Sequence, residues 1–469
     1  MRKLLLPLAA LTCGLLSAQP APENAQMFRP NDVVCYVGDS ITHGGTYHSI
    51  VTLFYVTRFP DRPMRFYNEG IGGDRASMIM SDERYRLNID ILGKKCTVAS
   101  IMLGMNDIGR GDYAIGQSGP ETEAKRAASL SIYHENMQKL IESLQKTGAR
   151  LILITPSIYE EAPKFSDPGH ADDPAIGANA ALAKAAAQVR EFAKQYHAGV
   201  ADFWGVMNSV NEEQRKTDPL FSVVGPNRVH PGPIGHFVMA YAFLKAQDAP
   251  REVATVSVNA RKKKAEHEVN CKIDKVAATK GQVEFDALEN ALPMVVPDDA
   301  KPALRLVPFE GQFNQEIVKV AGLKKGSYEL KIDQASIGEY SAEELQAGVD
   351  IAENPATPQY QQSAAVTAIN TDRTKLAAKM RDIVSTKYAM SRGKFDVLDR
   401  DALLKRLQTQ VTASKTHDAA YNRLEAALKD TEEPGKLDAQ YEEMITAMYK
   451  GAQPHAHHFV LTMKVTAAK

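Results

Sequence analysis

The chain has 469 residues, a formal net charge of −1 at pH 7, and 44% hydrophobic and 24% charged residues. A chain of this length usually has more than one hydrophobic core, so two or three domains are expected. The near-neutral charge excludes the strongly basic surface of most nucleic-acid-binding proteins, and the composition is that of an ordinary globular protein.

Residues 1–20 have the layout of a secretory signal peptide. Arg2 and Lys3 precede the apolar stretch 4–16, and the small residues Ser17 and Ala18 follow it. The apolar stretch is too short to span a bilayer, and no later segment of the sequence is a candidate for spanning one. The pattern predicts export to a secreted or periplasmic location, with cleavage near Ala18.

Three cysteines, Cys35, Cys96 and Cys271, follow the predicted signal peptide. Such a sparse, odd set argues against a disulfide framework, and the spacing is not that of a zinc site. Cys35 and Cys96 lie in or beside predicted buried strands, so we expect them to act as small hydrophobic residues. A bridge between these two is the alternative if their strands are neighbours.

Short apolar runs alternate with amphipathic stretches between residues 33 and 246. The predicted strands are 33–38, 64–68, 96–103, 150–155 and 199–202. The predicted helices are 46–58, 76–92, 122–146, 177–196, 203–215 and 234–246. This alternation predicts an α/β fold, with a doubly wound parallel five-stranded sheet and right-handed crossovers.

Four polar or glycine-rich motifs stand out in this region: GDSIT at 38–42, GIGGD at 70–74, GMND at 104–107 and NRVHP at 227–231. The first three follow predicted strands, and the carboxyl ends of parallel strands meet in one crevice. Ser40 is placed there as a nucleophile or, alternatively, as part of a helix N-cap. A glycine loop also suits a phosphate, although 70–74 lacks the spacing of the known nucleotide-binding loops.

Together the motifs supply the groups that acyl transfer from an ester requires. Ser40 is the candidate nucleophile, and His230 is the candidate base that takes its proton. The backbone N–H groups of Ser40 and Gly73 and the side-chain amide of Asn106 are candidate donors to the oxyanion.

The order and spacing of the four motifs resemble the SGNH (GDSL) hydrolase family, over about residues 31–247. The resemblance implies a flavodoxin-like catalytic domain at 26–250, with Ser40 as nucleophile and His230 as general base and acid. It also implies Gly73 and Asn106 as oxyanion donors, although Gly72 is equally permissive beside Gly73. It implies no metal and no cofactor.

One position departs from the family pattern. The family usually has aspartate three residues before the histidine, and here that residue is Asn227. In a serine protease the corresponding change from aspartate to asparagine costs roughly 10⁴ in rate. A Ser40–His230 dyad is the favoured interpretation, with Asn227 Oδ1 or a backbone carbonyl accepting the Nδ1 proton. Recruitment of Asp202 or Asp218, or a weak or inactive enzyme, are the alternatives.

Other polar residues near the motifs are candidates for the substrate pocket, namely Asp39, His43 and Asp107. We expect Asp39 and Asp107 to brace the loops rather than to catalyse. His43 and His48 follow the nucleophile on the same helical stretch, and Arg110 is a candidate contact for a polar or anionic substrate.

The pattern changes after about residue 250. Alternating strand patterns occur at 253–259, 268–276, 282–286, 304–307, 317–321, 328–332 and 458–465. They predict a small antiparallel β-domain, formed by 251–340 together with 456–466. Residues 341–455 have the pattern of an α-helical hairpin or bundle. In its first apolar seam, where apolar residues recur every three or four positions, Arg373 stands at a position between them.

These features predict an exported serine esterase. An acylated carbohydrate or another small ester is the expected substrate, with removal of O-acetyl groups as the leading case. No nucleic-acid partner and no integral membrane segment is expected, and the sequence does not specify an oligomeric state. A catalytically weak or inactive carbohydrate-binding or structural protein on the same fold is the first alternative. A phosphate or nucleotide binder that uses residues 70–74 is the second.

Overall fold

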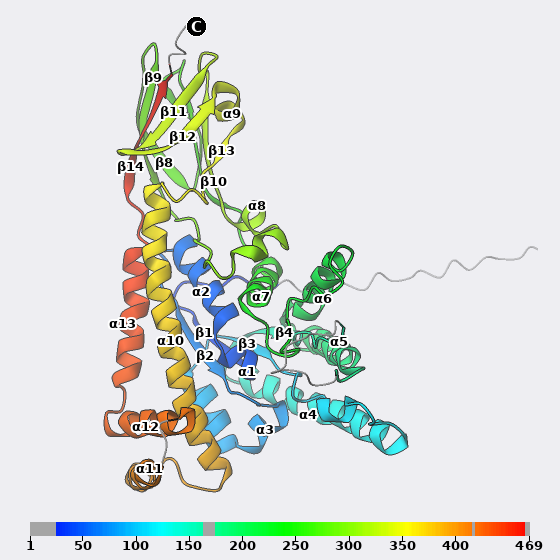
Figure 1. Ribbon diagram of the computed structural model, residues 1–469. Coiled ribbons are helices and arrows are strands. Elements are labelled where there is room, and N and C mark those ends of the chain that lie inside the picture. The colour runs from blue at the N-terminus through cyan, green and yellow to red at the C-terminus, as the bar shows by residue number, and fades with distance from the viewer. Residues whose placement is uncertain (1–24, 163–173, 415–417, 465–469) are drawn as a thin grey trace, which may run out of the picture.

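The N-terminal half contains a five-stranded sheet (Figure 1). The computed structural model describes residues 25–162, 174–414 and 418–464, so the predicted signal peptide lies outside the described residues. In spatial order the strands are β2 (Arg65–Gly70), β1 (Val33–Gly38), β3 (Val98–Met102), β4 (Arg150–Ile154) and β5 (Gly199–Ala201). Every neighbouring pair is parallel, which confirms the predicted α/β fold. All of β3 is buried, which explains its uninterrupted apolar run.

Helices cover both faces of this sheet (Figure 1). The α-helices are α1 (Ser40–His43), α2 (Thr46–Arg58), α3 (Ala76–Ser81), α4 (Pro120–Gln145), α5 (Ala178–Tyr196), α6 (Phe203–Gln214) and α7 (Pro233–Ala246). Three further helical turns are the π-helix η1 (Glu83–Ile91) and the 3₁₀ helices η2 (Leu92–Lys94) and η3 (Arg110–Tyr113). Helix α2 packs against α7, and α4 packs against both α3 and α5.

The single helix predicted over 76–92 is divided in the structure. Helix α3 ends at Ser81, and the backbone of Asp82 leaves the helical region, with φ −117° and ψ 64°. The Asp82 side chain then accepts a hydrogen bond from the Tyr85 N–H and caps η1. An aspartate that competes for backbone donors in this way interrupts a helix that the apolar periodicity alone would continue.

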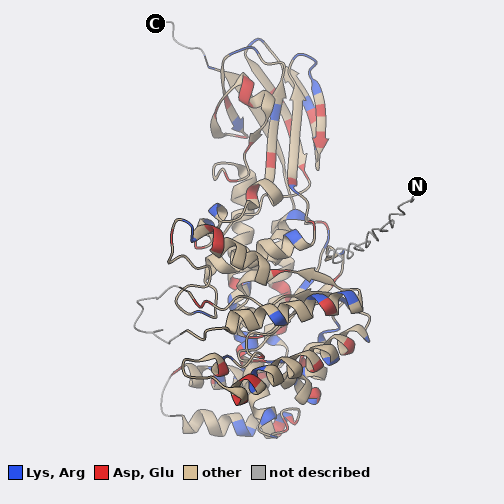
Figure 2. Cartoon of the chain, turned by 90° about the vertical axis from the view of Figure 1, so that its right-hand side faces the viewer, with Lys and Arg blue, Asp and Glu red and all other residues tan. Residues whose placement is uncertain are grey.

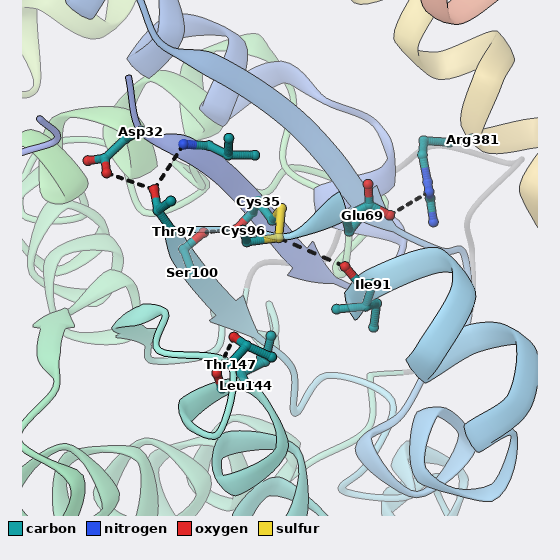
Figure 3. Close-up of a disulfide and its surroundings, with 11 residues drawn as sticks. Asp32, Cys35, Glu69, Ile91, Cys96, Thr97, Ser100, Leu144, Thr147 and Arg381 are labelled. Carbon is teal, nitrogen blue, oxygen red and sulfur yellow. Dashed lines mark hydrogen bonds and ion pairs between the residues drawn. A yellow bond between two sulfur atoms is a disulfide. The ribbon is translucent and has the colours of Figure 1, made fainter. Parts of the chain in front are cut away.

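A disulfide joins Cys35 in β1 to Cys96, just before β3, with their Cα atoms 5.9 Å apart (Figure 3). The expectation that both cysteines act only as small hydrophobic residues was therefore wrong. The parallel pairing of β1 with β3 sets Val34 opposite Val98 and brings the two cysteines together. The bridge ties the strand before Ser40 to its neighbour.

Removing this disulfide is expected to destabilise the fold. The bridged residues are 61 positions apart in the sequence, and closing a loop of that length is worth about 4 kcal/mol in the chain-entropy description. We expect the Cys35→Ala/Cys96→Ala variant to lose about that much free energy of unfolding in a urea titration. Cys271→Ala, which removes the free cysteine, is the control. Equal unfolding midpoints for the wild type and the double variant would contradict the prediction.

The second half of the chain contains two further sheets. Their strands are β6 (Glu252–Asn259), β7 (Lys264–Val269), β8 (Cys271–Ala278), β9 (Gln282–Glu289), β10 (Gln315–Ala321), β11 (Ser327–Ile332), β12 (Ala335–Ser341), β13 (Val349–Asp350) and β14 (Ala456–Met463). One sheet has the order β13-β10-β6-β7 and the other β12-β11-β14-β9-β8. Strand β14 pairs with β9 and β11, so the intervening helices are inserted between strands of one sheet.

Two details of this half differ from the sequence prediction. Strands β6 and β10 pair in parallel, whereas an antiparallel domain was expected. The strand predicted at 304–307 is absent, because residues 301–305 form the 3₁₀ helix η4 (Lys301–Arg305). Pro302 stands in the first turn of that helix, where its fixed φ is favourable and its missing N–H costs nothing.

The remaining helices are α8 (Phe309–Phe313), α9 (Ala342–Ala347), α10 (Pro358–Arg392), α11 (Arg400–Ala413), α12 (Ala419–Glu432) and α13 (Lys436–Gly451). The long α10, yellow in Figure 1, runs beside the N-terminal domain and packs on α2, β2 and η1. Buried Arg373 of α10 donates hydrogen bonds to the Asn370 side chain and to the Tyr441 hydroxyl, so the gap in the apolar seam is filled by a buried polar network.

Basic and acidic residues are interspersed over the face of the molecule shown in Figure 2, in keeping with the near-neutral net charge. Within the described ranges, no helix has both the length and the apolar character needed to cross a membrane.

Candidate active site

Ser40 is the first residue of α1, directly after β1. Gly38 is required at the end of that strand, because a Cβ there would lie 2.2 Å from Thr42 Oγ1 and 2.8 Å from the Met102 carbonyl oxygen. Asp39 is the N-cap, and its Oδ1 accepts a hydrogen bond from the Ile41 N–H at 3.0 Å. The Ser40 hydroxyl is therefore not needed as a cap, and its Oγ lies 2.8 Å from His230 Nε2.

His230 is oriented by Asn227. The backbone N–H of His230 and its ring Nδ1 both lie 2.8 Å from Asn227 Oδ1. A backbone N–H only donates, so the Asn227 atom that faces it must be the acceptor oxygen. The same oxygen then accepts from Nδ1–H, which leaves the lone pair of Nε2 directed at the Ser40 hydroxyl. Asn227 thus selects the tautomer of His230 in which Nε2 can accept the proton of Ser40.

The two carboxylates considered as substitutes for the missing aspartate lie elsewhere. Asp202 caps α6, accepting from the Gly205 N–H, and forms an ion pair with Arg190 at 2.8 Å. Asp218 accepts a hydrogen bond from the Leu220 N–H. Both carboxylates therefore have partners other than His230.

The loop that carries His230 is held by Arg228, a residue that sequence analysis missed. Its φ of +63° lies in the left-handed region, which non-glycine residues rarely adopt. Its Nη1 donates to the carbonyl oxygens of Glu160 and Ala162 at 2.9 and 3.1 Å, and its own carbonyl accepts from the Glu160 N–H at 2.9 Å. These bonds fix the conformation from which Asn227 and His230 project.

The glycine loop, residues 70–74, has two candidate backbone N–H donors, of which one is free and the other already has an acceptor. The Gly72 N–H donates to His43 Nδ1 at 3.1 Å. Gly73 has φ +78°, and its N–H has no acceptor among the described residues. The geometry therefore distinguishes the two glycines, which the sequence left equivalent.

The other two candidate donors also have unused capacity. The Ser40 N–H lies at the start of a helix, where backbone donors have no acceptor within the helix. Asn106 Nδ2 uses one of its two protons to donate to the Asp74 carbonyl oxygen at 3.1 Å.

Asp39 and Asp107 are both buried, with exposed fractions of 1% and 8%. Asp107 accepts from the N–H groups of Ala76 and Gly104 at 2.8 and 3.0 Å, and so joins the loops after β2 and β3. Burial raises the pKa of each of these carboxyls to about 7. His43 is half-buried beside the glycine loop.

His48 lies away from solvent. It is buried and stacks on Tyr36, with ring centroids 4.6 Å apart. Burial lowers its pKa to about 3, so it remains neutral.

A buried ion-pair network supports the glycine loop from the C-terminal helices. Arg381 of α10 donates to Glu69 Oε2 and Asp90 Oδ1, each at 2.8 Å, and its Nε donates to the Gly70 carbonyl oxygen at 3.1 Å. Figure 3 shows Arg381 directed at Glu69. Arg86 extends the network to Asp74, with Nε 2.9 Å from Oδ2. Sequence analysis missed Arg381. It is the second buried arginine of α10 and comes eight positions after Arg373.

The neutral form of His230 is favoured by its surroundings. Partial burial, and then the positive charge of Arg110, lower the pKa of His230 below its usual value of 6.5. A histidine accepts a proton only when it is neutral, so activity should fall as the pH decreases through this lowered pKa. We expect kcat/KM to be half-maximal below pH 6.5. Arg110→Gln should move the acidic limb of the pH profile to higher pH, and a shift to lower pH would contradict the assignment.

A parallel sheet that presents a serine and a tautomer-selected histidine at its carboxyl edge defines the protein as a serine hydrolase of the α/β class. Residues 36–237 match the sequence model of the GDSL-like Lipase/Acylhydrolase family. The protein is an ester hydrolase of the GDSL type. Among the described residues, no group of three or more His, Cys, Asp or Glu side chains could hold a metal ion.

Two relatives are similar over different extents. An acetylxylan esterase of Geobacillus stearothermophilus is 24% identical over 225 residues, which cover 45% of this chain and 91% of the esterase. A solved structure described as "BT4096 a gut microbial diltiazem-metabolizing enzyme" is 28% identical, with a TM-score of 0.84. That match covers 95% of this chain and all of the other, so it includes the C-terminal half.

Proposed function

We propose that this protein is an exported carbohydrate esterase that removes O-acetyl groups, with Ser40 as nucleophile and His230 as general base and acid. The observation that carries the proposal is the 2.8 Å contact between Ser40 Oγ and His230 Nε2. The similarity to an acetylxylan esterase over the catalytic domain supports the substrate class. Export is supported by the sequence of residues 1–20 and by the Cys35–Cys96 disulfide, because such bonds persist in oxidising compartments.

The geometry supports a two-step reaction. Ser40 Oγ attacks the ester carbonyl carbon while its proton passes to His230 Nε2. The N–H groups of Ser40 and Gly73 and Asn106 Nδ2 donate to the oxyanion. The bond to the alcohol breaks as His230 returns the proton to the leaving oxygen, which leaves an acetyl group on Ser40. A water molecule, deprotonated by His230, then attacks this ester, releases acetate and restores the serine.

Asn227 is expected to support this reaction without a carboxylate. Asn227→Asp keeps both hydrogen bonds to His230 and adds a negative charge, so the pKa of His230 should rise and the acidic limb should move to higher pH. Because the tautomer is already correct in the wild type, we expect kcat/KM at pH 8 to change by less than about 10-fold, far less than the roughly 10⁴ seen where the tautomer is wrong. A gain approaching 10⁴ would show that the wild-type dyad is defective.

The proposed function is tested by labelling and product analysis. A fluorophosphonate should attach to the tryptic peptide that contains Ser40, and excess p-nitrophenyl acetate should slow the attachment. Acetylated xylo-oligosaccharides should release acetate, and p-nitrophenyl acetate should be a better substrate than p-nitrophenyl octanoate. Absence of labelling, or acetate release that a fluorophosphonate does not inhibit, would contradict the proposal.

A further inference from the structure

A cavity of about 750 Å³ lies between the glycine loop and the C-terminal helices. Gly72 and His43 form the side that belongs to the catalytic domain. The opposite walls come from α10, α11, α12 and the loop after α10. Figure 1 shows α11 and α12 below the catalytic sheet, where the C-terminal end of the long α10 also lies. Sites of 300–1,000 Å³ are typical for small ligands.

The cavity borders the glycine loop beside Gly73, one of the candidate oxyanion donors. Gly72 precedes Gly73, and the Cα atoms of consecutive residues are about 3.8 Å apart. His43 lies three residues after Ser40 in α1, and its Nδ1 accepts the Gly72 N–H. Because Gly72 and His43 line it, this cavity is the candidate space for the alcohol portion of an ester held at Ser40.

The lining carries an excess of positive charge. Arg406 and Arg423 line the cavity, are exposed, and form no ion pair within the described residues. Asp382, the carboxylate among the lining residues, lies 3.6 Å from His43 Nε2. Two arginines without acidic partners suit a ligand carboxylate, which a guanidinium binds in bidentate geometry.

The same cavity has an apolar wall. Met390, Phe395 and Leu424 are half-buried and line it. A flat apolar surface beside charged and hydroxyl-bearing groups is complementary to a sugar ring, which has an apolar face and a polar rim. Ser385 and Thr386 supply hydroxyl groups on α10.

We propose that this cavity is a subsite for the alcohol portion of the substrate, and that it prefers an acetylated oligosaccharide bearing a uronic acid. Arg406 and Arg423 bind the carboxylate, and Phe395 contacts the sugar. The link to catalysis rests on the proposed esterase function, whereas the binding preference can be measured without turnover.

Binding should be measured by calorimetry on Ser40→Ala, with acetylated xylo-oligosaccharides that either carry or lack one glucuronic acid branch. We expect the acidic ligand to bind at least about 5-fold more tightly at low salt, since a hydrogen-bonded charge pair is worth that much or more. Adding Arg406→Gln or Arg423→Gln should each reduce this preference about threefold or more, and 0.5 M NaCl should reduce it as well. Lys405→Gln, which removes a neighbouring exposed charge that does not line the cavity, should leave the preference intact.

Equal affinities for the two ligands would overturn the proposal, and so would an equal loss of preference in Lys405→Gln. A second assay separates this outcome from failure of the esterase function. Acetate release by the chain with Ser40 present tests the function alone, whatever the ligand preference. A preference without acetate release would refute the esterase and keep the subsite. Acetate release without a preference would refute the subsite and keep the esterase.

Discussion

Ser40→Ala is expected to lower kcat for p-nitrophenyl acetate by roughly 10⁵- to 10⁶-fold. This is the range found when the serine or the histidine of a serine hydrolase is removed, because the remaining oxyanion donors and binding contacts supply only a small residual rate. His230→Ala should cost about as much, and the double variant should cost little more than either single variant, because the two side chains act as one unit. The measurement is steady-state kinetics at pH 8.

Ser81→Ala is the matched control, since Ser81 is exposed at the end of α3 and its hydroxyl only donates to the Met78 carbonyl oxygen. Its kcat should equal that of the wild type, and thermal unfolding should show that all the variants fold. Additive losses in the double variant, or substantial activity in Ser40→Ala, would show that the 2.8 Å contact between Ser40 and His230 is not the reacting pair.

The catalytic half was the more predictable part of the chain for a physical reason. Strands such as β1 and β3 are buried on both faces and therefore carry continuous apolar runs. The glycine at position 38 then follows from the sharp turn between β1 and α1, which presents Ser40 at the start of the helix. Because parallel strands end at one edge, the motifs that follow them could be predicted to meet.

Tertiary information decides the features that the sequence left open. Nothing local in the sequence shows that Asn227 Oδ1 accepts two hydrogen bonds, since this depends on the left-handed turn at Arg228. The choice between Gly72 and Gly73 likewise depends on His43, which comes from a different loop. The Cys35–Cys96 bridge depends on strand order, which periodicity does not encode.

The C-terminal half resisted prediction because its partners are distant in sequence. Arg381 lies 312 positions from Glu69 and 291 from Asp90, so its role as a buried cation is not apparent in the periodicity of α10. The parallel pairing of β6 with β10 is also a long-range feature, since other strands intervene in the sequence. The sequence predicted only a helical hairpin or bundle here, yet α10 places Arg381 against the Gly70 carbonyl oxygen at the start of the glycine loop.

Arg381→Met is expected to lower both stability and activity. Removing one partner from a buried ion-pair network costs about 3–5 kcal/mol, because Glu69 and Asp90 would be left with less compensating charge. Burial already raises the pKa of Glu69, and loss of the arginine removes the charge that opposes this shift. The Gly70 carbonyl oxygen loses its donor, so the loop that contains Gly73 should move. A displacement of about 1 Å at a catalytic group can cost about 10²-fold in rate.

Three variants separate positioning from simple destabilisation. Arg381→Lys keeps the charge but not the forked geometry, and it should recover part of the stability while kcat stays low. Lys387→Gln breaks an ion pair that the same helix makes with Asp430 of α12, and it should leave kcat unchanged. Glu69→Gln, combined with Arg381→Met, should cost less than the sum of the single changes, because both act on one network.

The kinetics should be measured at 10 °C, where every variant can be shown by circular dichroism to be folded. Under these conditions we expect Arg381→Met to lower kcat about 10- to 100-fold, with KM for p-nitrophenyl acetate nearly unchanged, because the loss affects the oxyanion donors more than ground-state binding. A folded Arg381→Met protein with the kcat of the wild type would limit α10 to a role in stability. A reduced kcat would instead show that α10 positions the glycine loop for catalysis.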